Sequence, residues 1–136
     1  MSVIDERQAV QRLVTVCPGF EPHWLAYLDS WEGKPSGEYN DISVLADWII
    51  GRMAAGATDC FPEVFDEVES LLVGATSEVR NVIVIGLLED IQNVSKDHHV
   101  DPDIALSYLG PESRKEWFFL IRHVQRDWPG RSQDES

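Results

Sequence analysis

Residues 77–94, SEVRNVIVIGLLEDIQNV, are the most informative segment of this chain for its fold class. Its central run, 82–88, is apolar on every side, which is typical of a helix surrounded by other helices. The alternating valines and isoleucines in this run also suit a β-strand. However, the pattern extends through Leu87, Leu88 and Ile91, well beyond the length of an ordinary strand. We therefore predict a central helix over 77–94 in an all-helical domain.

Amphipathic spacing predicts further helices on both sides of this segment. Ser2 and Asp5 have the spacing of a capping box, and the longest loop is expected at 32–40. The pattern indicates a compact bundle or a curved stack of six to seven helices in a single domain over 1–130, with a disordered tail at 131–136. The other helices are expected from Ser2 to before Pro18, from near Pro22 to Trp31, from about Asp41 to Gly56, over 61–73 with Gly74 as a cap, over 102–108, and from Gly110 to Trp128.

The chain is strongly acidic, with a formal net charge of −13 over 136 residues. Nucleic acids and anionic membranes attract Lys and Arg at their contacts, so this charge argues against both as partners. It favours a protein partner with a basic surface, and solubility alone is the alternative explanation. No apolar stretch reaches the length of a membrane span and the N-terminus lacks a signal-peptide pattern, which favours a cytoplasmic protein.

The two cysteines, Cys17 and Cys60, are isolated in the sequence and have no metal-ligand spacing. This pattern is typical of two reduced, buried thiols in a cytosolic protein. A single disulfide between them is the alternative.

Acidic residues are concentrated in 35–79, which holds nine acids and one base, Arg52. On the helix expected at 61–73, Glu63, Asp66 and Glu67 fall at i, i+3 and i+4, so we expect three like charges to share one exposed face with no Lys or Arg to relieve them. Their repulsion costs only a few tenths of a kcal/mol per pair, which suits a partner-binding face, a merely solvated face or, less well, a cation site. We predict that a basic partner contacts this face and its surroundings. The candidate residues are Glu63, Asp66, Glu67, Asp59, Glu38, Asp41, Asp47 and Trp31.

The densest group of possible metal ligands lies in 97–103. Adjacent histidines in an irregular segment do not converge on a metal as a helical i, i+4 pair does, so we interpret the group as a solvated loop and expect no metal. The group consists of Asp97, His98, His99, Asp101 and Asp103.

The sequence contains no clear catalytic motif. Glu89 and Asp90 are a possible carboxylate pair for acid–base chemistry with His23 or His123, but nothing in the sequence fixes their geometry. There is no nucleophile elbow, glycine-rich phosphate loop or Walker-type lysine. The sequence therefore indicates neither an enzyme nor a cofactor.

Three framework stretches resemble a family of small all-helical bacterial immunity proteins that pair with polymorphic or contact-delivered toxins. They are DISVLADWI at 41–49, EVRNVI at 78–83 leading to GLLE at 86–89, and YLGP at 108–111 before a Trp-bearing helix. The resemblance covers roughly 41–128 and implies a protein that binds and blocks a cognate toxin. It assigns no site residue. The alternatives are a helical adaptor that binds a peptide or helix and, less favoured, a small metal-dependent hydrolase using 97–103.

Overall fold

The chain folds into helices. The computed structural model describes residues 4–31 and 37–124, and no strand occurs in these two ranges. This confirms the all-helical prediction. The elements are α1 (Glu6–Val16), the 3₁₀ turn η1 (Pro18–Phe20), α2 (Glu21–Ser30), α3 (Glu38–Ala55), α4 (Phe61–Val73), α5 (Ser77–Asn81), the π-helical segment η2 (Val82–Glu89), α6 (Asp90–Asp97), α7 (Asp103–Leu106) and α8 (Pro111–His123).

The ends of the N-terminal helices differ in part from the sequence-based expectation. The capping box of α1 joins Asp5 to Gln8, because the Asp5 carboxylate accepts from the Gln8 backbone N–H and the Gln8 side chain accepts from the Asp5 backbone N–H. Ser2, which was expected to begin the box, lies outside the described residues. Helix α3 begins at Glu38, earlier than expected, after Gly37 with a φ of 132°. Its end at Gly56, which adopts the left-handed conformation, is as predicted.

The central helix is confirmed. Segments α5, η2 and α6 follow one another without a break from Ser77 to Asp97, so the strand interpretation of the apolar run is wrong. Helix α3 lies along η2 and α6. The two helices approach each other closely at Gly86, where an added Cβ would lie 2.4 Å from Cγ2 of the buried Ile42. A side chain at position 86 would therefore force the two helices apart.

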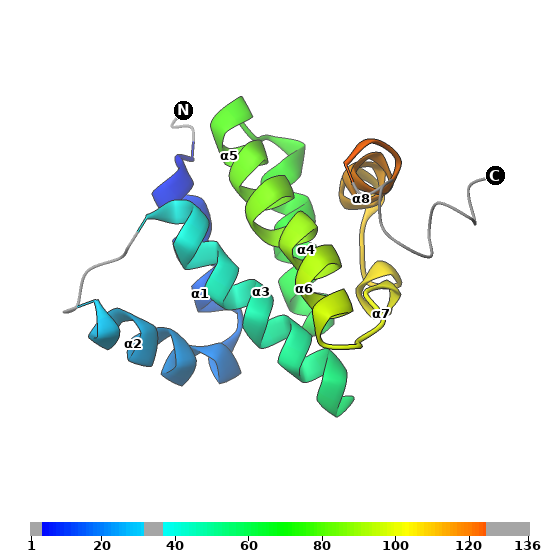
Figure 1. Cartoon of the computed structure of the whole chain (residues 1–136). Helices are drawn as coiled ribbons and strands as arrows, with labels where there is room; N and C mark the ends of the chain where they lie inside the picture. The colour runs from blue at the N-terminus through cyan, green and yellow to red at the C-terminus, as the bar shows by residue number, and fades with distance from the viewer. Residues whose placement is uncertain (1–3, 32–36, 125–136) are drawn as a thin grey trace.

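The remaining helices complete a compact bundle around this pair (Figure 1). Helix α1 packs on α4 and α3, α2 lies at one edge, and α8 packs on α4 and η2 at the opposite edge. One continuous core joins these elements, and its largest fully buried side chains include Phe20, Phe61, Phe65 and Trp117. The expected tail at 131–136 and the helix end at Trp128 lie outside the described residues.

Candidate protein-binding surface

The exposed edge of α4 carries three acidic side chains, Asp59, Glu63 and Asp66, which we call the acidic ridge. Asp59 lies just before the helix, and Glu63 and Asp66 are one turn apart on it. All three are exposed, and no ion pair within the described part of the chain involves them. The ridge therefore presents concentrated negative charge to solvent.

Glu67 is not part of this free surface. Its carboxylate forms an ion pair with the Arg12 guanidinium of α1, and its side chain is only 20% exposed. The expectation that no base relieves the charges of this helix is wrong, because the base comes from another helix. Glu67 thus serves the contact between α1 and α4.

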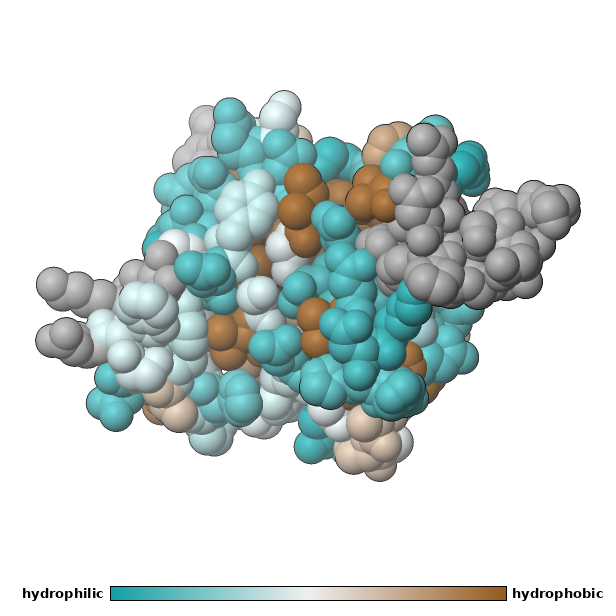
Figure 2. Space-filling model, in the orientation of Figure 1, coloured by the Kyte–Doolittle hydropathy of each residue, from teal (hydrophilic) through white to brown (hydrophobic). Residues whose placement is uncertain are grey.

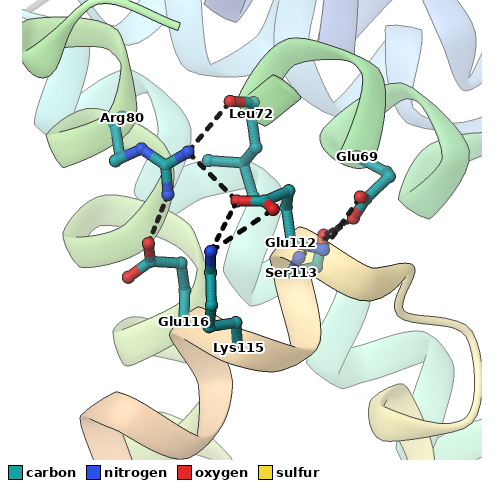
Figure 3. Close-up of polar contacts among 7 residues, drawn as sticks. All are labelled: Glu69, Leu72, Arg80, Glu112, Ser113, Lys115 and Glu116. Atoms are coloured by element: carbon teal, nitrogen blue, oxygen red, sulfur yellow. Dashed lines mark hydrogen bonds and ion pairs between the residues drawn. The ribbon is translucent and has the colours of Figure 1, made fainter. Parts of the chain in front are cut away.

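The other face of α4 uses Glu69 to hold α8. The Glu69 carboxylate accepts hydrogen bonds from the backbone N–H groups of Glu112 (2.9 Å) and Ser113 (2.9 Å) and from the Ser113 hydroxyl (2.8 Å), as Figure 3 shows. It therefore satisfies free donors in the first turn of α8. Burial alone would raise the pKa of Glu69, but these hydrogen bonds and the positive charge of Arg80 lower it overall.

Arg80 reinforces the same junction. Its guanidinium pairs with Glu116 and Glu112 of α8 and donates to the Leu72 carbonyl at the end of α4, 3.1 Å away (Figure 3). Sequence reasoning missed both Glu69 and Arg80 because neither contact is local. One indication in the sequence was Pro111, since proline is typical of the first position of a helix. The backbone N–H groups in the first turn of a helix need acceptors from outside it.

Two more of the predicted partner-binding residues belong to an internal ion-pair network. Arg7 of α1 donates to Asp41 (2.9 Å) and to Glu38 (2.8 Å), and the Tyr27 hydroxyl donates to Asp41 (2.7 Å). The Asp41 side chain is 0% exposed, so the prediction that it contacts a partner is wrong. Glu38 is partly exposed, but it too is neutralised by Arg7.

Asp47 lies on α3, away from the ridge, beside a cavity of about 380 Å³ between α3 and α6 that His98 also lines. Partial burial raises the pKa of Asp47 despite the nearby His98 and His23. Burial, followed by the charge of Asp47, also raises the pKa of Asp90, whose carboxylate accepts from the Ser43 hydroxyl at 3.3 Å. Asp47 and Asp90 therefore lie close enough for the charge of one to act on the other.

Trp31 follows α2 and is 52% exposed. It stands at the edge of 32–36, a segment outside the described residues. Leu25 on the same helix is also exposed, whereas Trp24 is buried, so only some of the apolar side chains of α2 face the core.

A groove runs beside the ridge. It has a volume of about 580 Å³ and is lined by α1 and by Glu67 of α4, with Ile4 and Val16 as its apolar side chains. Glu63 of the ridge precedes Glu67 by one turn of α4, so one end of the ridge lies near this groove without lining it. A partner seated in the groove would meet apolar surface and negative charge together. Elsewhere, the face drawn in Figure 2 is mainly hydrophilic, with apolar patches separated by hydrophilic side chains.

The 97–103 group forms the turn between α6 and α7. His99 has a φ of 59°, and the Asp101 carboxylate accepts from the Asp103 backbone N–H at 3.0 Å. Within 4–31 and 37–124, no three His, Cys, Asp or Glu side chains are grouped so that they could hold a metal ion.

The proposed acid–base set is not assembled either. His23 packs on Phe20 and His123 packs on Phe119, with ring centroids 5.9 and 4.6 Å apart. Among the described residues, no hydrogen bond or ion pair joins either histidine to Glu89 or Asp90.

The fold and this surface define an all-helical domain with an acidic ridge beside a groove. The chain belongs to the family described as Domain of unknown function (DUF7674), whose model matches residues 10–123. No curated protein and no solved structure matches it. Within the described residues, no helix combines the length and the apolar character needed to cross a membrane.

Proposed function

We propose that this chain is a protein-binding module, acting without catalysis, whose acidic ridge meets a basic surface on its partner. We further propose that the partner is a toxin domain and that binding neutralises it, as the immunity-protein resemblance implies.

The proposal rests on one observation: some acids of α4 make contacts with other helices, and others make none in the described part of the chain. Glu67 is paired with Arg12 and Glu69 is committed to α8, so both have structural roles. Glu63 and Asp66 have no such contact in the described part of the chain, and they lie together with Asp59. Negative charge of this kind attracts basic partners and accelerates their encounter. Many toxin domains that act on nucleic acids need basic surfaces to bind them, so their charge complements the ridge.

A helical adaptor is the second candidate, and the groove beside α1 favours it. An amphipathic helix binds by placing its apolar side chains in such a groove. The apolar side chains of the groove, Ile4 and Val16, come from the segment just before α1 and from the last residue of α1. A basic amphipathic helix would place its apolar side chains there and its basic side chains against the ridge.

The test is association kinetics with a toxin domain encoded next to this chain. In the ridge variant, Asp59→Asn, Glu63→Gln and Asp66→Asn are combined. The matched control combines Asp29→Asn, Glu78→Gln and Asp97→Asn, which removes the same formal charge from exposed positions elsewhere. We expect the ridge variant to associate roughly tenfold more slowly with a weaker salt dependence, and the control to stay within about twofold of the unchanged chain.

Equal association rates for the two variants would contradict the ridge as the binding surface. A growth assay with the co-expressed toxin separates the two candidate functions. Protection that weakens in the ridge variant supports the immunity role. Binding to a basic helical peptide without any protection supports the adaptor.

A further inference from the structure

Two cysteines far apart in the sequence meet at the junction of α1 and α4. Cys17 follows the last turn of α1 and Cys60 precedes the first turn of α4, and the residues are 43 positions apart. Their sulfur atoms are 3.1 Å from each other, and both are free thiols. Such a close approach needs a movement of only about 1 Å to reach the length of a disulfide bond.

We propose that Cys17 and Cys60 form a modification site, at which a small-molecule disulfide such as glutathione disulfide converts the two thiols into an internal disulfide. The bond would tie the end of α1 to the start of α4, beside the acidic ridge. The inference stands apart from the proposed function, since it rests on the two thiols alone.

The burial of the two residues assigns them different roles. Cys17 is 0% exposed, whereas Cys60 is partly exposed. Burial, together with its hydrogen bond to Cys60, raises the pKa of Cys17 to about 12, so this thiol stays protonated at neutral pH. An external disulfide therefore meets Cys60 first, because the thiolate is the attacking species and it must reach the reagent.

The reaction consists of two thiol–disulfide exchanges. The Cys60 thiolate attacks one sulfur of glutathione disulfide, forming a mixed disulfide and releasing one glutathione thiolate. Cys17 then loses its proton, and its sulfur attacks the Cys60 sulfur. The Cys17–Cys60 bond forms, the Cys60–glutathione bond breaks, and a second glutathione leaves. Two cysteine thiols are oxidised and one glutathione disulfide is reduced to two glutathiones.

Both positions tolerate such a bond because they lie at helix ends. Neither residue is inside a helix, so pulling the sulfurs together does not distort a run of helical hydrogen bonds. The bond closes a long loop, and closing a long loop restricts the unfolded chain. We therefore expect oxidation to raise the Tm of thermal unfolding by roughly 5 to 15 °C, an increase that dithiothreitol reverses.

The experiment incubates the full chain with glutathione disulfide and measures intact mass before and after alkylation of free thiols. We expect the unmodified chain to lose the mass of two hydrogen atoms and to resist alkylation. Cys17→Ser should stop at the mixed disulfide on Cys60, and Cys60→Ser should acquire no glutathione while it is folded. Circular dichroism checks that each variant folds, and Cys17→Ala replaces Cys17→Ser if the serine variant does not.

Three results would overturn the inference. The first is an unmodified chain that keeps two alkylatable thiols. The second is a chain that stops at a mixed disulfide with glutathione. The third is a chain that forms only disulfide-linked dimers. The first measurement uses the unmodified chain, so it is decisive even if every variant fails to fold.

Discussion

Two junctions in this bundle hold their helices together by different means. Where α3 meets η2, the contact is apolar and close, and Gly86 lies directly against the buried Ile42. Where α4 meets α8, the contact has a polar margin, with Glu69 accepting three hydrogen bonds and Arg80 pairing with two acids of α8. The first depends on shape, and the second depends in large part on charge and hydrogen bonding.

The two kinds of junction determine which acids of this chain remain available to a partner. An apolar junction such as α3–η2 needs no charged side chain. At a polar junction, acidic side chains are engaged in contacts between helices. Glu69 is engaged in this way between α4 and α8, and Glu67 between α1 and α4. The acidic ridge is what remains on α4 after both of its polar junctions are satisfied.

Adding one methyl group to the apolar junction should have the largest effect. In Gly86→Ala, the new Cβ would lie 2.4 Å from Cγ2 of the buried Ile42, so one of the two helices must shift, and we expect a loss of about 3 kcal/mol in the free energy of unfolding. Urea denaturation followed by circular dichroism measures it. Gly51→Ala on α3 is the control, because an added Cβ there meets nothing within 4 Å. It should gain up to about 1 kcal/mol from helix propensity. If Gly86→Ala unfolds at the same urea concentration as the unchanged chain, the contact between α3 and η2 does not require a glycine at position 86.

Removing the carboxylate from the polar junction should cost somewhat less. Glu69→Ala leaves the Glu112 and Ser113 donors without their acceptor, so we expect a loss of about 2 kcal/mol. The same urea experiment applies. Glu63→Ala, on the exposed face of the same helix, should change stability by less than about 0.5 kcal/mol. Equal losses in these two variants would show that the hydrogen bonds to α8 do not stabilise the fold.

Acid should weaken the polar junction and leave the apolar one unchanged. The pKa of Glu69 is lowered below its ordinary value of 4.5 in the folded chain. Its contribution is therefore fully present above pH 4.5 and is lost as the pH falls through the folded-state value. The stability difference between the unchanged chain and Glu69→Gln should shrink over this range, whereas the difference caused by Gly86→Ala should stay constant. Urea titrations at a series of pH values give both differences, and a constant Glu69→Gln difference would contradict the role of the charge.

The helices themselves were largely predictable from the sequence because apolar periodicity is a local signal. The range 61–73 and the end of α3 at Gly56 match the structure. The start of α3 was placed too late. Glu38 and Asn40 are polar and carry no apolar period, yet the Asp41 N–H already donates to the Gly37 carbonyl.

The candidate surface was predictable only in part. Spacing on one helix indicated that Glu63 and Asp66 are exposed, and they are. It failed for Glu67, and the choice of Glu38 and Asp41 as neighbouring partner-binding acids failed as well. Their partners, Arg12 and Arg7, lie more than thirty residues away in the sequence. Only the packing of α1 on α3 and α4 brings these bases to the acids.

The π-helical segment gives the central helix one place where its length can change. A π-helix closes its hydrogen bonds over five residues instead of four, so it holds more residues per turn than an α-helix. Losing a single residue from Val82–Glu89 would let the segment return towards α-helical hydrogen bonding, and Gln92 and Ser95 of α6 would keep their buried positions. The same loss within an α-helix such as α3 would turn everything that follows by about 100° about the helix axis. During divergence of the family, the central helix should therefore accept the loss of one residue in η2 more readily than in α6.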